Sequence, residues 1–356
     1  MTPVELSRTV LRAVRRAVDG GELDVDVPGR VRVGPPGPGG CGDYATGIAL
    51  QLARPAGQPP YRVAEVLRAH LTGADGIADV VLTGPGFLNI SLHRAAPAEL
   101  VAEVLRRGPR YGHVVPEDGA GERRPVGLRC EHHPRALVVA DAAARILRSQ
   151  GALARVSCTT SPPPEWAVVL GVRVDVDVDA GRPAPDEPPV DIRPVPAPGD
   201  PLPLGRDAGR WALLHPAAHD RPRIGDEHLV QRESNPLFRV RYAHARTRAL
   251  ARNAADLGFA AEPGPVEHPD THGMYALLAD HPRVLAAAAD HHAPDRLARH
   301  LVTVADAVLP FLPAVLPRGG EKPSAAHRAR LALAEAAGTV LAGGLTLLGI
   351  DAPDHL

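Results

Sequence analysis

The sequence predicts three parts: an α+β N-terminal domain, a short α/β segment in the middle, and an all-α C-terminal helical bundle. Two observations support this division. Apolar residues first mix helical and alternating spacing and later keep helical spacing alone. In addition, 39 prolines and 35 glycines among 356 residues indicate long connecting segments between folded cores. We expect the three parts at 1–110, 111–204 and 205–356.

The first part combines helices with a hairpin. Apolar residues recur at helical spacing from Leu6 to Ala17, which predicts an opening amphipathic helix. Further helices are expected at 43–54, 60–71 and 95–107. The segments 80–82 and 87–92 flank Thr83-Gly84-Pro85-Gly86, and this arrangement predicts a β-hairpin.

The middle part begins with a β-strand, helix, β-strand pattern. A strand at 126–130, a helix at 136–149 and a strand at 153–158 would form one βαβ unit. Residues Trp166–Asp179 contain VRVDVDVD, whose period of two is typical of a half-buried strand. The proline-rich, acidic segment 180–203 predicts a linker.

The last part is expected to be a bundle of helices. One apolar stripe follows the helical repeat at Leu297, Leu301, Val304, Val308 and Phe311. A second stripe holds Leu331, Ala334, Leu341, Leu345 and Leu348. The final helix should end at Gly349, whereas Pro310 and Pro313 should end the preceding one.

The charge of the chain limits its partners. The 40 basic and 41 acidic residues give a net charge of −1, so no global basic field is available to hold nucleic acid. We expect no DNA partner, and any affinity for RNA should be weak and salt-sensitive. Lys322 is the only lysine of the chain.

Cysteine and histidine spacing indicates neither disulfides nor a metal site. Cys41, Cys130 and Cys158 form no Cys-x-x-Cys pair, so we expect reduced thiols in a cytoplasmic protein. The pair His132-His133 and the triplet Asp290-His291-His292 lack the spacing of metal ligands. No segment predicts a membrane span, so a membrane partner is not expected.

Several sequence segments together resemble one family of enzymes. GDYATGIALQLARPAG, starting at Gly42, and GPGFLNISL, starting at Gly84, resemble the N-terminal add-on domain of arginyl-tRNA synthetases. NPLFRVRYAHARTRAL (235–250) resembles the first helix of that family's DALR anticodon-binding bundle, and 295–317 and 331–353 resemble its later helices. The resemblance implies a DALR-type bundle and tRNA as partner, with arginine tRNA as the first candidate and the identity of the tRNA left open.

The resemblance also implies residues that would contact tRNA. In the N-terminal domain, Tyr44 would stack on a base and Asn89 would hydrogen-bond to one. The alternative is that Asp43 caps a helix and Tyr44 simply packs. In the bundle, the implied contacts are Tyr242, His244, Arg246 and Phe311, although His244 and Arg246 are equally compatible with solvated or bracing roles.

The middle part departs from the family pattern. EHHPRALVVADAAARILRSQGALARV (131–156) resembles the first crossover of the family's catalytic domain, but His132-His133-Pro134-Arg135 stands where the His-x-Gly-His signature belongs. A Lys-Met-Ser-Lys loop cannot exist in a chain whose only lysine is Lys322. We therefore interpret 111–204 as a degenerate, truncated remnant of the catalytic domain, with no catalytic residues and no cofactor.

The leading hypothesis is an arginyl-tRNA synthetase-like protein that binds tRNA without aminoacylating it. One alternative is a residual arginine–tRNA ligase, which would use ATP as its cofactor. A tRNA-dependent transferase is a variant of this enzyme alternative. Another alternative is a scaffold that binds a protein partner and no longer binds RNA. A polar pocket within 111–234 would favour an enzyme, whereas a contiguous apolar patch on the bundle would favour a scaffold.

Overall fold

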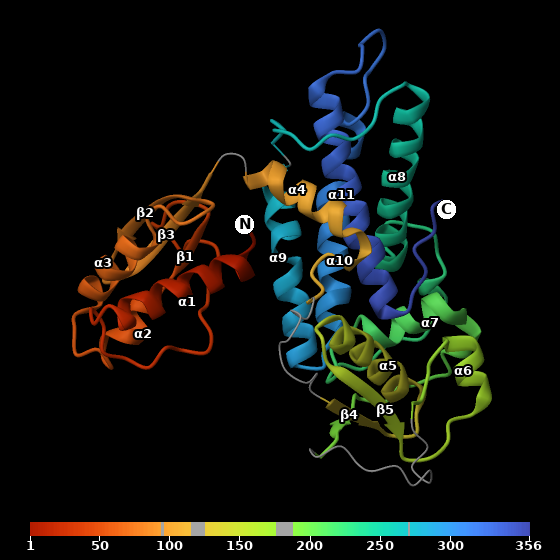
Figure 1. The fold of residues 1–356 in the computed structure, drawn as a ribbon. Helices are drawn as coiled ribbons and strands as arrows, with labels where there is room; N and C mark the ends of the chain where they lie inside the picture. The colour runs from red at the N-terminus through yellow and green to blue at the C-terminus, as the bar shows by residue number, and fades with distance from the viewer. Residues whose placement is uncertain (94–95, 115–124, 176–187, 270) are drawn as a thin grey trace. The chain divides into compact units, whose positions relative to one another are not determined.

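The computed structural model describes residues 1–93, 96–114, 125–175, 188–269 and 271–356 (Figure 1). These residues form two compact units, Met1–Leu100 and Val101–Leu356. The first contains an antiparallel sheet with helices, and the second contains a small parallel sheet with a helical bundle. The predicted fold class is confirmed, whereas the proposed boundaries at 110 and 204 stay a prediction.

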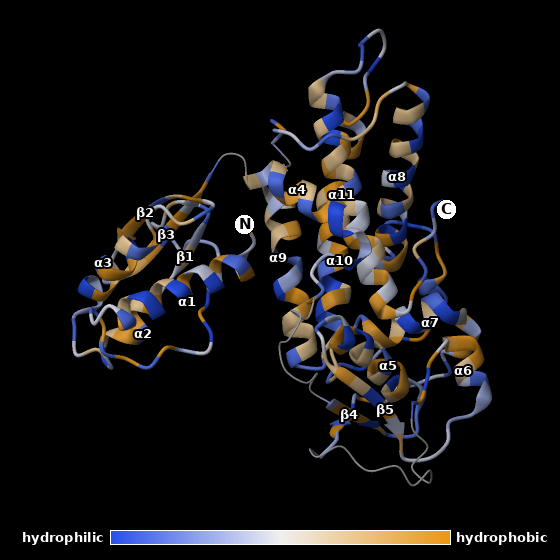
Figure 2. Ribbon diagram, viewed as in Figure 1, coloured by the Kyte–Doolittle hydropathy of each residue, from blue (hydrophilic) through white to orange (hydrophobic). Residues whose placement is uncertain are grey.

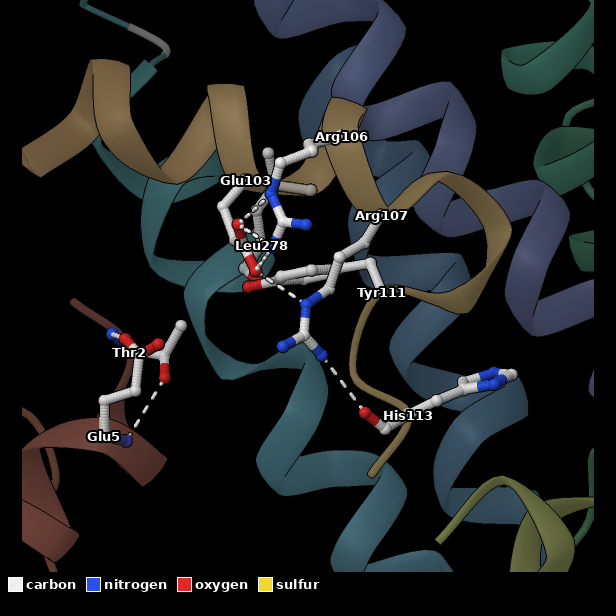
Figure 3. A network of polar contacts seen from close by, with 8 residues as sticks. All are labelled: Thr2, Glu5, Glu103, Arg106, Arg107, Tyr111, His113 and Leu278. Atoms are coloured by element: carbon white, nitrogen blue, oxygen red, sulfur yellow. Dashed lines mark hydrogen bonds and ion pairs between the residues drawn. The ribbon is translucent and has the colours of Figure 1, made fainter. Parts of the chain in front are cut away.

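The first unit packs three helices against a three-stranded sheet. Its elements are α1 (Pro3–Asp19), β1 (Tyr44–Thr46), α2 (Ile48–Ala53), α3 (Pro60–Leu71), β2 (Ile77–Thr83) and β3 (Phe87–Leu92). The strands are antiparallel in the order β1-β3-β2. The predicted stripe of α1 is buried, and the helix begins at a capping box in which Thr2 and Glu5 exchange hydrogen bonds (Figure 3).

The predicted helix at 43–54 is wrong in its first residues. Tyr44–Thr46 form a strand because they pair with β3, and the helix starts only at Ile48. Asp43 does not cap a helix; its carboxylate accepts the Leu92 N–H at 2.7 Å and so ties the start of β1 to the end of β3. The GDYATG phrase is therefore a sheet edge followed by a short helix.

The second unit contains the predicted βαβ motif. Before that motif, the unit contains the last residues of α4 (Ala96–Arg107), inside which the first unit ends, and the 3-10 turn η1 (Gly108–Arg110). Strands β4 (Pro125–Cys130) and β5 (Leu153–Cys158) are parallel and in register, and α5 (Pro134–Ser149) connects them. A third parallel strand, β6 (Val190–Ile192), gives the order β5-β4-β6.

Two predictions for the middle part require correction. The strand predicted from VRVDVDVD does not form at 172–175, the part of that pattern that the structure describes. Before it, Pro164–Leu170 form helix α6, and Gly171 ends this helix in the left-handed conformation that glycine adopts readily. The predicted linker 180–203 contributes β6 to the sheet. The rest of the VRVDVDVD pattern, 176–179, lies outside the described residues. Asp175 is described, and its carboxylate binds the Val156 N–H and Arg148.

The rest of the unit is the predicted helical bundle (Figure 1). Its α-helices are α7 (Gly205–Leu214), α8 (Pro236–Asp256), α9 (Thr271–Asp290), α10 (Pro294–Val308) and α11 (Ala325–Leu348). Short 3-10 turns are η2 (Leu202–Leu204), η3 (Asp226–His228) and η4 (Leu312–Ala314). Both predicted apolar stripes are buried, α10 ends before Pro310, and Gly349 ends α11 with φ of 73°.

Helix α11 contradicts the expectation that no segment is long and apolar enough to span a membrane. It is long and apolar enough to cross a membrane by length and composition (Figure 2). However, 78% of its apolar window is buried inside the protein. The helix packs against α8 and α10, so its hydrophobicity is that of a core helix.

A buried ion pair attaches the βαβ motif to the bundle. Arg210 of α7 lies 2.7 Å from the Asp141 carboxylate of α5, and the exposed fractions of the two side chains are 0% and 4%. Arg210 also donates to the carbonyls of Leu348 and Leu170, at 2.7 and 2.9 Å. Burial lowers the pKa of the Arg210 guanidinium, and the charge of Asp141 opposes this effect. One side chain thereby joins α5, α6, α7 and α11.

Arg135, in the first turn of α5, makes a second attachment. Its side chain is fully buried and donates only to backbone carbonyl oxygens, at 2.5 to 3.2 Å. The acceptors are Val195, Leu213, Pro216, Ala217 and Asp220. Because five carbonyls share one guanidinium, the loop after α7 is fixed to the start of α5.

Three histidines, His113, His281 and His300, gather near the end of η1 and between α9 and α10. Tyr111 and His281 stack at 5.9 Å, and His281 and His300 stack at 5.3 Å between ring centroids. The Tyr111 hydroxyl donates to Leu278 O, and Arg107 holds the His113 carbonyl (Figure 3). Burial lowers the pKa of His113, places that of His281 well below its ordinary range, and lowers that of His300 to about 4.

Removing Arg210 should destabilise the second unit strongly. We expect Arg210→Met to lower the free energy of unfolding by about 3 kcal/mol or more, because it leaves a buried carboxylate and two buried carbonyls with fewer partners. Arg145→Met is the matched control: Arg145 contacts the same carboxylate, at 3.0 Å, but is 27% exposed. The control should cost about 1 kcal/mol or less. If urea unfolding showed the same loss of unfolding free energy for both variants, the buried pair would contribute no more stability than the partly exposed one.

Acid should weaken the second unit through the histidine cluster. The unfolded chain takes up protons near pH 6.5, whereas folded His300 does so only near pH 4. Stability is therefore complete above pH 6.5 and falls between pH 6.5 and 4, by about 3 kcal/mol from His300 alone. Urea midpoints measured across this range should decline less steeply in His300→Met, whereas His219→Asn, at an exposed position, should decline like the unaltered protein.

Candidate nucleic-acid interface

One face of α8 presents a ladder of two aromatic rings and an arginine. Phe238 and Tyr242, four residues apart, stack with centroids 5.4 Å apart and planes 18° from parallel. The Arg246 guanidinium lies 5.9 Å from the centre of the Tyr242 ring. Tyr242 is 37% exposed, and Arg246 is exposed with no carboxylate in ion-pair range among the described residues. An exposed ring and a partly exposed ring beside an unneutralised cation can stack bases and bind phosphates.

A cavity of about 340 Å³ opens beside this ladder. Phe238 and the exposed side chains of Leu229, Val230 and Leu356 give it apolar walls, and Arg241 and Gln231 are among its polar groups. The side chain of Asn235 shapes the rim of the cavity. Its amide nitrogen donates to the backbone carbonyls of His228 and Val230, and its Oδ1 accepts the Leu237 N–H and so caps α8. Asp207 and Asp351 also line the cavity, so it combines apolar walls with polar groups of both charges, and such a site can stack a nucleobase and bind its edge by hydrogen bonds.

The C-terminal tail neutralises another face of α8. Asp354 lies 3.1 Å from Arg248, and its backbone carbonyl accepts from Arg252 at 3.3 Å. A cavity of about 500 Å³ lies between α8, α11 and the tail, and Glu335 lines it. Burial raises the pKa of the Glu335 carboxyl, and Arg248 opposes this effect. Positive charge on α8 is therefore left uncompensated at Arg246 rather than at Arg248.

Three of the residues implied by the family resemblance are buried. Asn89 is 2% exposed; its amide donates to Thr83 Oγ1 at 2.6 Å and accepts from the Cys41 N–H. His244 donates through Nδ1 to Gly338 O at 3.1 Å, and burial lowers its pKa. Phe311 is fully buried, with His268 edge-on to its ring at 5.5 Å. These positions argue against direct contact with a base.

The other implied residues are more accessible. Tyr242 and Arg246 are exposed on α8, and Tyr44 is partly exposed on β1. Phe238 was not among the predicted contacts, whereas Leu356 belongs to the C-terminal tail that the resemblance implies as part of this face. The i, i+4 spacing of Phe238, Tyr242 and Arg246 was a usable signal for the first, because such residues share one face of a helix.

The carboxyl edge of the parallel sheet is the other place where a ligand could bind. Here the structure uses its polar groups internally. His133 Nδ1 accepts the Ala136 N–H at 3.1 Å and so caps α5, and burial lowers the His133 pKa. His132 packs on Trp166, with centroids 5.1 Å apart. The guanidinium of Arg135 is fully engaged by carbonyls. The two cavities described above lie on the bundle side.

Alanine substitutions of Phe311 and Tyr242 should distinguish a side chain that packs in the core from one that lies on the surface. Phe311→Ala should lower the free energy of unfolding by about 3–5 kcal/mol, because it empties a fully buried site. Tyr242→Ala should cost about 1 kcal/mol or less, because the side chain is 37% exposed. Urea unfolding followed by circular dichroism measures both. A large loss in Tyr242→Ala would assign that ring to packing.

Comparison with known proteins places these surfaces in one family. Residues 5–92 match the arginyl-tRNA synthetase N-terminal domain, and residues 240–356 match the DALR anticodon-binding domain. An arginine–tRNA ligase of Renibacterium salmoninarum is 28% identical over 550 aligned positions covering all of both chains. Because this chain has 356 residues, the remaining aligned positions have no residue here. An arginine–tRNA ligase of Clavibacter sepedonicus is 39% identical over 43% of this chain and 29% of its own length.

Solved structures agree in fold. Thermus thermophilus arginyl-tRNA synthetase aligns over 100% of both chains with a TM-score of 0.65 and 16% identity. The Plasmodium falciparum arginyl-tRNA synthetase aligns over 99% of both, with a TM-score of 0.68 and 7% identity. The two domain matches, in the same order as the two structural units, lead to one conclusion. The chain is an arginyl-tRNA synthetase-related protein with a DALR-type anticodon-binding domain.

Proposed function

We propose that this protein binds tRNA through the α8 face and does not aminoacylate it. The observation that carries the proposal is the ladder of the partly exposed Phe238 and the exposed Tyr242 and Arg246, whose Phe238 lines a cavity of mixed polarity within a domain of the anticodon-binding type. Unstacked anticodon bases expose faces that aromatic rings can stack on. The net charge of −1 favours weak, salt-sensitive binding.

The absence of aminoacylation is proposed from the middle of the chain. Adenylate formation needs donors aimed at the charge that develops on the phosphate. At the start of α5, where the family signature would lie, His133 caps its own helix and Arg135 is surrounded by carbonyl oxygens. The only lysine, Lys322, lies in the loop between η4 and α11. These groups support a structural role for the segment.

Binding of fluorescently labelled arginine tRNA tests the proposal. Tyr242→Ala should weaken binding about tenfold, since stacking contributes about 1–3 kcal/mol per base. Arg246→Gln should also weaken it and make the binding constant less dependent on salt, because a phosphate contact is lost. Arg283→Gln is the control: this arginine is exposed on α9 and paired with Asp280.

The outcomes distinguish the alternatives. Stronger binding of arginine tRNA than of an unrelated tRNA, together with a selective effect of the α8 variants, supports the proposal. No binding at low salt would favour the scaffold alternative and a protein partner. If Arg283→Gln weakened binding as much as Arg246→Gln, general charge rather than the ladder would account for it. A role in the cytoplasm stays a prediction from composition.

A further inference from the structure

The two buried cysteines, far apart in the sequence, meet in the parallel sheet. Cys130 is the last residue of β4 and Cys158 the last of β5, and they are register partners. Their sulfur atoms lie 3.4 Å apart, and both thiols are free. The sequence contained this signal, because PVGLRC and LARVSC are strands of six residues that both end in cysteine.

We propose that Cys130 and Cys158 are a site of reversible oxidation to an intramolecular disulfide. Neighbouring strands lie about 4.7–4.9 Å apart, which falls within the range of about 4.4–6.8 Å for Cα atoms of disulfide-bonded cysteines. The bond would link the ends of β4 and β5 and enclose all of α5. That helix carries both Arg135 and Asp141, so oxidation would reinforce the motif that attaches to the bundle.

The chemistry needs an oxidant such as hydrogen peroxide. Peroxide oxidises the thiol of Cys158, the more exposed of the two at 4%, to a sulfenic acid, and one water is released. The sulfur of Cys130 then attacks the sulfenic sulfur, the S–S bond forms, and the hydroxyl leaves with the remaining thiol proton as a second water. The thiols lose two electrons in total, and the peroxide gains them.

Burial determines the rate of this reaction. Cys130 is fully buried, and desolvation and the neighbouring thiol raise its pKa, so the reactive thiolate is scarce. We therefore expect a slow modification during sustained oxidation rather than a rapid catalytic exchange. Cys41 is exposed and lies in the other unit, so it provides an internal reference.

The test treats the full-length protein with hydrogen peroxide in its folded state. Peptide mass spectrometry without reduction should show the Cys130 and Cys158 peptides joined, with the loss of two hydrogens. Cys41→Ser should form the same link. Dithiothreitol should reverse it, and the oxidised protein should unfold at a temperature several degrees higher, because the cross-link restricts the unfolded chain.

Other outcomes would overturn the proposal. Oxidation of Cys41 while Cys130 and Cys158 remain unlinked would do so, as would irreversible sulfinic or sulfonic acids at either buried position. The link in the unaltered protein is read directly, so the test does not depend on a cysteine variant that folds. Cys158→Ser adds a second check, since it should remove the rise in unfolding temperature.

Discussion

The second unit depends on charged groups that are buried in order to join its parts. Arg210 and Asp141 form a salt bridge in the protein interior, and Arg210 also donates hydrogen bonds to carbonyls at the ends of α6 and α11. Desolvating two charges is costly, so such a pair is retained only where its geometry is well satisfied. Gly349 shows how closely the site is packed, because a Cβ there would lie 2.5 Å from the Arg210 guanidinium.

The buried contacts of Arg135 and Asp141 give the middle of the chain a structural role in supporting the bundle. The βαβ motif has the parallel topology of a nucleotide-binding unit, but His133 and Arg135 at the start of α5 bind protein groups rather than facing an open crevice. Arg135 and Asp141 make the motif a support for α7, α11 and the loop that follows α7. The βαβ motif can thus help to keep the bundle, and with it α8, in position.

Much of the fold followed from local patterns in the sequence. The α1 stripe, the hairpin, the βαβ unit and the bundle stripes were predictable, because each depends on the periodicity of one segment. Tyr44–Thr46 were not, since a three-residue strand forms only by pairing with β3, more than forty residues away. Of the candidate site, Tyr242 and Arg246 were identified on the surface, but the burial of Asn89 and Phe311 depends on contacts that no local pattern encodes.

The central claim is that a synthetase-related chain has a tRNA-binding surface without the chemistry of the synthetases. Exchange of labelled pyrophosphate into ATP, with arginine and with or without arginine tRNA, tests it most directly because it reports adenylate formation before any transfer to tRNA. The account predicts exchange at the level of a protein-free control under all conditions. Arginine-dependent exchange above that level would contradict it, and would mean that the middle segment still forms an active site.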